Sequence, residues 1–381
     1  MTARTREIAS LDVMRLAAAQ AVMFYHLVFM SWAEEGSRGI RAVVGTPVVF
    51  ADAVVWASLG WIGVQIFFVI SGFVILMSAQ DKSASDFLIG RVTRIVPALW
   101  FFTVLSGLVI LASGVLSVAE LTPRFLRSMV LFPVGPWVDG AVWTLVTEAL
   151  FYAVVFGIIK AGKIGRVTAI AGAVTAFNLV FWCIVLAGEA GALGETGHWL
   201  AGGASSYKLR VTLISTNCYF VTGASLYQIF MGRSVGANSL MFVINFGVGL
   251  ISTYYAARSS LGVSAFGQDP ALAAAAWGIL TLLMSACVLM RVGSGARFVR
   301  FATVAGLLTY PLYLINQITG GYLLGLAYRT GLSPVLAVLL TAAACTVLAG
   351  LFAMAVERPL QLWLKKGLRQ IRRSVLVPRE A

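Results

Sequence analysis

The chain has 381 residues, of which 60% are hydrophobic and only 11% are charged, and 28 basic against 15 acidic residues give a net charge of +13. A water-soluble domain carries about 25% charged residues, so this composition excludes an ordinary soluble globular protein. Lipid is the solvent that such a chain requires. The sequence therefore predicts an all-α, polytopic integral membrane protein.

Apolar runs long enough to cross a bilayer recur along the whole chain. The first begins with Asp12 and Arg15 and is too long and too charged for a cleaved signal peptide, so we predict a retained first helix. The segment 120–133 is too short to cross and predicts an interfacial or re-entrant helix. A span needs about 20 residues, and about ten segments reach that length: 11–32, 54–79, 95–118, 142–161, 167–188, 211–231, 240–257, 270–290, 302–328 and 334–356.

The basic residues indicate how the chain crosses the membrane. An even number of spans leaves both termini on one side, and most of the 28 basic residues fall on the termini and loops of that side. The positive-inside rule then places both termini in the cytoplasm. We expect a transmembrane domain at 1–360 and a basic cytoplasmic tail at 361–381. This tail can lie on anionic lipid, so membrane lipid is an expected partner and nucleic acid is not needed to explain the charge.

The first span carries ionisable side chains, which are costly inside a membrane and indicate function. Asp12 and Arg15 are three residues apart and can pair along one helix face. Arg15 and His26 are separated by about three turns, roughly 16 Å along the axis, and are expected to project toward the same side. The alternative is a helix-end ion pair and a histidine that only hydrogen-bonds to a neighbouring helix.

Polar residues of two other spans are expected at the depth of His26. Counting 1.5 Å per residue places Glu148 of the fourth span and Asn316 and Gln317 of the ninth at about the same level. A neutral imidazole there can take a proton from a hydroxyl, and a carboxylate can hold its tautomer. We therefore predict that Glu148 orients His26, and we expect no metal.

Two arginines follow the second span. Arg91 and Arg94 are predicted to lie in the loop before Pro97, which opens the third helix, and two guanidinium groups one turn apart can grip phosphate oxygens. The alternative is that they are ordinary positive-inside charges. Within the second span, Ser71 and Gly72 predict close approach of another backbone or of a ligand tail. A nucleophilic serine is the less favoured reading because no base is visible beside it.

Together these residues resemble the membrane-bound acyltransferase family 3, which includes bacterial O-acetylases of polysaccharides, lipopolysaccharide and Nod factors. Six short motifs occur in the family's order and span nearly the whole chain. They are Leu11-Asp12-Val-Met-Arg15 followed by His26, the segment 63–73 with Gly63 and Gly72, the segment 91–97 with Arg91, Arg94 and Pro97, the segment 143–152 with Trp143, Glu148 and Tyr152, the segment 309–315, and Glu357-Arg358-Pro359.

The resemblance implies an O-acyltransferase that moves an acyl group, commonly acetyl, from cytoplasmic acetyl-CoA or another acyl-CoA to a sugar hydroxyl. The acceptor would be a surface polysaccharide, a lipid-linked glycan or a secreted oligosaccharide such as a Nod factor. Many members have a histidine where this chain has Asn316, so that histidine's role does not carry over. The expected roles are catalytic for His26, Glu148 and Arg15, donor-binding for Arg91, Arg94 and Ser71, acceptor-binding for Asn316, Gln317 and Trp143, and structural for Asp12, Gly63, Gly72, Pro97, Tyr152, Glu357 and Pro359.

His26 is predicted either to act as general base on the acceptor hydroxyl or to carry the acyl group transiently. An alternative from another class is a transporter or flippase of a glycan or lipid-linked intermediate, with no acyl transfer. The lack of an internal repeat weighs against it. A second alternative is a scaffold subunit of a polysaccharide export complex. Expected partners are the glycan or glycolipid acceptor and other polysaccharide-assembly proteins.

Overall fold

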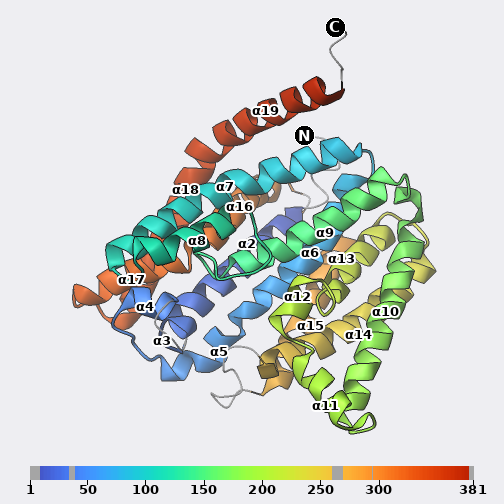
Figure 1. The fold of residues 1–381 in the computed structure, drawn as a ribbon, viewed down its shortest axis with the longest axis horizontal. Coiled ribbons are helices and arrows are strands. Elements are labelled where there is room, and N and C mark those ends of the chain that lie inside the picture. Colours follow the sequence, from blue (N-terminus) through green and yellow to red (C-terminus); the bar gives the residue numbers. More distant parts are fainter. Residues whose placement is uncertain (1–8, 34–38, 260–268, 294, 377–381) are drawn as a thin grey trace.

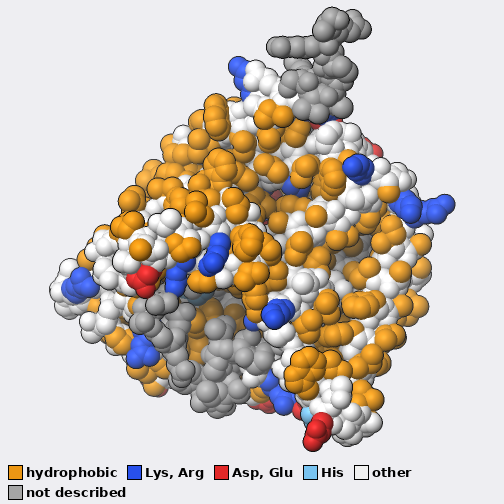
Figure 2. All heavy atoms as spheres, viewed as in Figure 1, with side chains coloured by type: hydrophobic (Ala, Val, Ile, Leu, Met, Phe, Trp, Pro, Cys, Tyr) orange, Lys and Arg blue, Asp and Glu red, His pale blue; other side chains and the backbone are white. Residues whose placement is uncertain are grey.

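The computed structural model describes residues 9–33, 39–259, 269–293 and 295–376, and within these ranges every regular element is a helix (Figure 1). Nine of the described helical segments are long and apolar enough to cross a membrane. Apolar side chains are spread over the face seen in Figure 2. Large ones such as Trp56 and Val243 are among the exposed residues of the chain. Such a surface suits lipid, and the predicted all-α, polytopic class is confirmed.

The first half of the chain supplies the helices that surround the later site. The first of them, α2, continues into a π-helical turn, η1, so the first span is not a uniform α-helix. In chain order the elements are α2 (Ala9–Phe24), η1 (Tyr25–Met30), α3 (Ser31–Ala33), α4 (Ile40–Val44), η2 (Ala51–Ala53), α5 (Val54–Ser58), η3 (Leu59–Trp61), α6 (Ile62–Ala79), α7 (Ala84–Ser113), α8 (Val118–Met129) and α9 (Val142–Lys160).

The second half completes the bundle. Its helix α16 packs against α2, so residues distant in sequence lie side by side. The elements are η4 (Ile164–Arg166), α10 (Val167–Glu189), α11 (Gly194–Gly203), α12 (Tyr207–Val211), α13 (Asn217–Phe230), α14 (Val235–Ser259), α15 (Pro270–Leu289), α16 (Ala296–Ile315), α17 (Ile318–Arg329), α18 (Pro334–Phe352), η6 (Ala353–Glu357) and α19 (Arg358–Leu376).

Helix α6 lies at the centre of the bundle and packs against α13, α2 and α9. Its contacts depend on glycine. A Cβ on Gly72 would collide with the carbonyl oxygen of Phe220, and one on Gly223 would collide with that of Val69. A Cβ on Gly63 would stand 2.6 Å from the Ala18 carbonyl oxygen. Small residues thus let three backbones approach closely, as was expected at Gly72.

The start of the third long helix was predicted wrongly. Helix α7 begins at Ala84 rather than at residue 95, so Arg91, Arg94 and Pro97 lie inside it and not in a loop or at its opening. The Ser83 side chain caps the helix by accepting a hydrogen bond from the Asp86 N–H at 3.1 Å. Charged residues in the first three turns lowered the hydropathy there and hid this start.

Two other predicted spans differ from the structure. The segment 211–231 contains the shorter helix α13, with α12 and a turn before it, and α13 is not among the nine described segments long enough to span. The segment 302–328 is interrupted at Asn316 and Gln317, which separate α16 from α17. The predicted short helix of 120–133 is α8, and its Ser117 and Glu120 form a capping box.

The predicted basic tail is helical over its described part. Helix α19 packs against α7, and Arg372 Nη1 lies 2.9 Å from Asp86 Oδ1. Residues 377–381 of the predicted tail lie outside the described residues. The two helices therefore run side by side at the end of the bundle where α2 begins (Figure 1).

Candidate active site

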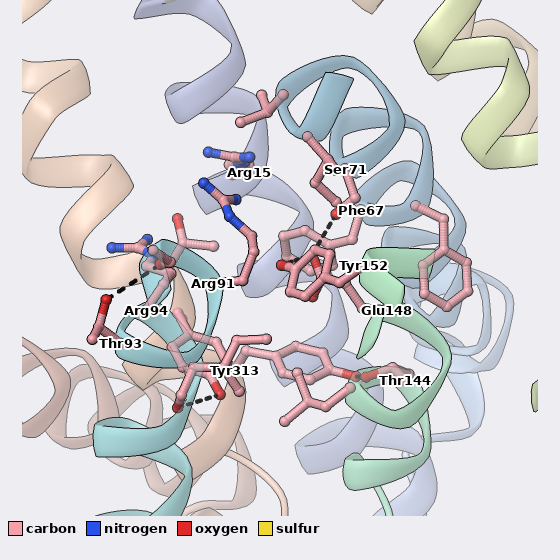
Figure 3. A pocket seen from close by; sticks show the side chains of 18 of the residues that line it. Arg15, Phe67, Ser71, Arg91, Thr93, Arg94, Thr144, Glu148, Tyr152 and Tyr313 are labelled. Atoms are coloured by element: carbon pink, nitrogen blue, oxygen red, sulfur yellow. Dashed lines mark hydrogen bonds between the residues drawn. The ribbon is translucent and has the colours of Figure 1, made fainter. Parts of the chain in front are cut away.

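A cavity of about 360 Å³ opens among α2, α6, α7, α9, α16 and α19. Figure 3 shows Arg15 and Arg91 on one side of it and Ser71, Glu148 and Tyr152 on the other. Its lining brings together Arg15, Val64, Phe67, Phe68, Ser71, Val74, Ile75, Gly90, Arg91, Thr93, Arg94, Ile95, Thr144, Leu145, Glu148, Tyr152, Thr309, Tyr310, Tyr313 and Gln361.

Three guanidinium groups make one end of this cavity, here called the arginine end. Arg15 Nη1 lies 3.2 Å from Asp12 Oδ1, which confirms the predicted pair. Arg94 Nη1 lies 3.8 Å from Oε1 of the buried Glu357. Arg91 lies over the Tyr152 ring, 5.7 Å from its centroid. Three cations held around one hollow form a site for an anion with several charges.

Glu148 joins the walls of the cavity beside the arginines. Its Oε1 accepts a hydrogen bond from Ser71 Oγ at 2.8 Å and another from the Tyr152 hydroxyl at 2.7 Å. The serine was predicted without a base beside it, and the structure places this carboxylate there. Thr144, Glu148 and Tyr152 follow one another at four-residue intervals on α9, a spacing that could have identified them as one face.

Aromatic and hydroxyl groups line the cavity away from the arginines. The Thr144 and Tyr313 hydroxyls lie 2.8 Å apart, and the Phe67 ring meets the Tyr313 ring edge-on, with centroids 5.6 Å apart. Three residues after Tyr313, about one turn of helix, stands Asn316. The next polar group along α16 is thus just beyond the cavity.

His26 meets Asn316 at this second place, here called the histidine end. The His26 Nδ1 and Asn316 Oδ1 atoms are 2.5 Å apart, and both residues are buried. His26 is not among the described residues that line the cavity. The structure therefore confirms that residues 26 and 316 share one level, but it does not place His26 in one hollow with Arg15.

The surroundings of Asn316 determine the direction of its hydrogen bond with His26. The Asn316 Nδ2 group donates to the carbonyl oxygens of Leu312 and Tyr313, both at 2.9 Å. Its Oδ1 can only accept, so Nδ1 of His26 carries the proton in this bond. In neutral His26 the lone pair is then on Nε2, the atom that can accept a proton or attack a carbonyl carbon.

The prediction that Glu148 orients His26 is wrong. The hydrogen-bond partners of Glu148 are Ser71 and Tyr152, whereas that of His26 is Asn316. A depth counted along each helix does not say which neighbour faces which, because helices tilt and rotate. The group that orients His26 is therefore an amide from the break between α16 and α17.

The other two residues predicted to bind the acceptor lie near this break. Gln317 Oε1 accepts a hydrogen bond from the Ala141 N–H at 3.1 Å, so it fastens the start of α9 to the break. Trp143 packs edge-on against Phe68, and the Arg210 guanidinium lies 5.2 Å from the Trp143 ring centroid. The Arg210 contact, from the short helix α12, was not predicted.

The model of the acyltransferase domain matches residues 8–354 of this chain. Over 141 residues the chain is 29% identical to the exopolysaccharide production protein ExoZ of Rhizobium meliloti (strain 1021), an alignment that covers 35% of this chain and 42% of that protein. The chain thus spans less than half the length of this relative. No solved structure matches it.

Proposed function

The chain belongs to the acyltransferase 3 family and is a membrane acyltransferase, and we propose that it moves an acetyl group from coenzyme A to a sugar hydroxyl of an extracellular polysaccharide or its lipid-linked precursor. The single observation that carries the proposal is the pairing, in one bundle, of a cavity with three arginines and a buried histidine whose Nδ1 is engaged by Asn316. The first feature suits a phosphorylated donor, and the second suits transfer.

The donor is assigned to the arginine end. Arg91 and Arg94 lie one turn apart on α7 and both line the cavity, so their planar guanidinium groups can hold phosphate oxygens from one side. Arg15 adds a third charge. The uncharged arm of the donor would then run past Glu148 toward Thr144 and Tyr313, and the thioester has to pass this pair to reach His26.

The transfer is assigned to His26 Nε2. As general base, Nε2 takes the proton of the acceptor hydroxyl while the hydroxyl oxygen attacks the thioester carbonyl carbon. The carbon–sulfur bond then breaks, and coenzyme A leaves as thiolate. In the alternative, Nε2 itself attacks that carbon, and coenzyme A leaves as thiolate. The acyl group then passes from Nε2 to the hydroxyl oxygen, and Nε2 takes up the hydroxyl proton. Both routes need the same tautomer, so Asn316 serves either one.

The chemical class of the acceptor and the orientation of the protein in the membrane are inferred from separate observations. ExoZ is named for exopolysaccharide production, which supports a polysaccharide acceptor here. The excess of basic residues on the side of the termini supports an arginine end that faces the cytoplasm, where coenzyme A is found. Gln317 and Trp143 lie near His26's partner Asn316, and they are the acceptor-binding candidates. Membrane lipid and other polysaccharide-assembly proteins are the partners we expect.

The test uses labelled acetyl groups. A deletion strain is complemented with the wild-type chain or with His26→Ala, and membranes are given radiolabelled acetyl-CoA. We expect label in the surface glycan with the wild-type chain and none with His26→Ala at equal expression. Unchanged labelling in the deletion strain, together with a fall in glycan export, would favour the transporter or scaffold alternative.

A further inference from the structure

The cavity is too small for a complete coenzyme A donor. At about 360 Å³ it lies near the lower limit of pockets for drug-sized ligands, about 300–1,000 Å³. It can hold the pantetheine arm with its adjoining phosphate, but the adenosine with its remaining phosphates has to lie outside. The mouth at the arginine end is where that charged part would emerge.

Helix α19 forms one wall of this mouth. Gln361 lines the cavity, and Glu357, just before α19, pairs with Arg94 at 3.8 Å. At the other end of the helix, Arg372 pairs with Asp86 of α7 at 2.9 Å. These contacts hold α19 along the first turns of α7, so the side chains between them border the space outside the arginines.

Two lysines stand beside these contacts: Lys365 lies between them on α19, and Lys82 lies just before α7, near the Arg372–Asp86 pair. Lys365 follows Gln361 by one helical turn and is therefore on the same face of α19. Lys82 directly precedes Ser83, the cap of α7. Neither lysine is among the described residues that line the cavity itself. They extend the positive charge of the arginine end outward.

The positive charges at this mouth repel one another. Partial burial, followed by the nearby positive charges of Arg91 and Lys365, lowers the pKa of the Lys82 ammonium, and only Asp86 acts in the other direction. Asp86 already accepts hydrogen bonds from Ser83 and Arg372. A polyanion placed among Lys82, Arg91 and Lys365 would relieve this repulsion.

We propose that Lys82 and Lys365 form a second phosphate subsite, which binds the phosphates of the nucleotide end of the coenzyme A donor outside the cavity. This proposal rests on the proposed function. Lysine suits the position, because its compact charge on a flexible stem follows a phosphate that leaves the cavity without fixed bidentate geometry. The pantetheine phosphate would remain with Arg91 and Arg94.

The test compares two ligands in purified protein held in lipid nanodiscs. Coenzyme A carries the nucleotide, and 4′-phosphopantetheine lacks it. We expect Lys82→Gln and Lys365→Gln each to weaken coenzyme A binding and raise the KM for acetyl-CoA about fivefold, with kcat unchanged. Binding of 4′-phosphopantetheine and the KM for its acetyl thioester should stay as in the wild type.

Lys366→Gln is the matched control, because Lys366 is the next residue on α19, exposed and equally charged. This variant should bind both ligands with the affinity of the wild type. The subsite is refuted if the combined variant Lys82→Gln/Lys365→Gln binds coenzyme A like the wild type, or if it loses affinity for both ligands to the same extent. If the wild-type protein binds neither ligand and transfers acetyl from neither thioester, the proposed donor is wrong and the subsite falls with it.

Discussion

The arginine end and the histidine end of the site are built in opposite ways. At the arginine end, charged groups from α2, α7 and α9 surround a hollow, and its arginines contact Asp12, Glu357 and the Tyr152 ring. At the histidine end, two buried side chains meet directly, and the Nδ2 group of Asn316 donates both its hydrogen bonds to carbonyl oxygens of its own helix. The arginine end has room for a ligand, whereas the histidine end holds the His26 imidazole in one tautomer.

This difference suits two separate roles at the two ends. Charged side chains in a hollow bind by attraction and tolerate exchange of ligands, so their loss should affect donor affinity. A histidine held by a single acceptor supplies a lone pair at Nε2, so its loss should affect the chemical step. The kinetic constants of variants can therefore distinguish the two ends.

The largest effect is expected at His26. His26→Ala should lower kcat about 10²- to 10⁴-fold, the usual contribution of a general base, with donor binding retained. Steady-state acetyl transfer in nanodiscs measures it. His198→Ala is the control, because His198 is the other histidine of the chain and is exposed on α11. A His26→Ala protein that folds and keeps full transfer would remove the histidine end from the mechanism.

The next largest effect is expected from the arginine pair. The double variant Arg91→Gln/Arg94→Gln should raise the KM for acetyl-CoA at least about a hundredfold, because each of the two charged hydrogen bonds contributes about 1.5–3 kcal/mol. The kcat at saturating donor should change much less. Arg300→Gln removes an exposed charge from the first turns of α16, outside the cavity lining, and should leave KM unchanged. A fall in kcat with KM intact would move these arginines into the chemical step.

A smaller effect is expected from Asn316. Asn316→Leu leaves the Nδ1 proton of buried His26 without its acceptor, so we expect kcat to fall about tenfold. Asn316→Asp keeps an oxygen toward Nδ1 and should retain more activity. Asn178→Leu is the control, because it removes a comparable hydrogen bond between two buried amides, Asn178 and Asn245. It should lower the thermal unfolding temperature without changing kcat per folded molecule. Equal losses in Asn316→Leu and Asn316→Asp would count against the tautomer argument.

The smallest effect is expected from Glu148. In Glu148→Gln an amide oxygen can still accept from Ser71 and Tyr152, so we expect a rise in donor KM of only about two- to threefold. Glu148→Leu removes that acceptor and should raise KM more. Comparison of both variants in the same assay tests this order. A loss of kcat in Glu148→Gln as large as that of His26→Ala would restore Glu148 to the histidine end.

The parts of the fold that were predicted correctly depend on hydrophobic length. Spans such as 142–161 and 270–290 agree closely with α9 and α15, because about 20 apolar residues have one solution in lipid. The start of α7 was missed because Asp86, Arg91 and Arg94 dilute its hydropathy, although Ser83 and Asp86 carry a capping signal. The polar pair Asn316-Gln317 was visible in the sequence, but hydropathy alone did not show that the helix breaks there.

The identity of the site residues could be predicted from the sequence better than the contacts between them. Arg15, Arg91, Arg94, Ser71 and Glu148 were singled out from the sequence, and all five line one cavity, whereas His26 is not among its described lining residues. The partner of His26 was not predictable, because a helical depth places Asn316 and Glu148 at one level and gives no rotation about the axis. Only packing distinguishes the amide from the carboxylate.

The most direct measurement takes donor binding and acetyl transfer from the same nanodisc preparation, for His26→Ala and for Arg91→Gln/Arg94→Gln. The account predicts that His26→Ala binds coenzyme A like the wild type and does not transfer, whereas the arginine variant binds weakly and recovers transfer at high donor concentration. Loss of binding in His26→Ala, or full transfer by it, would contradict the division between the two ends.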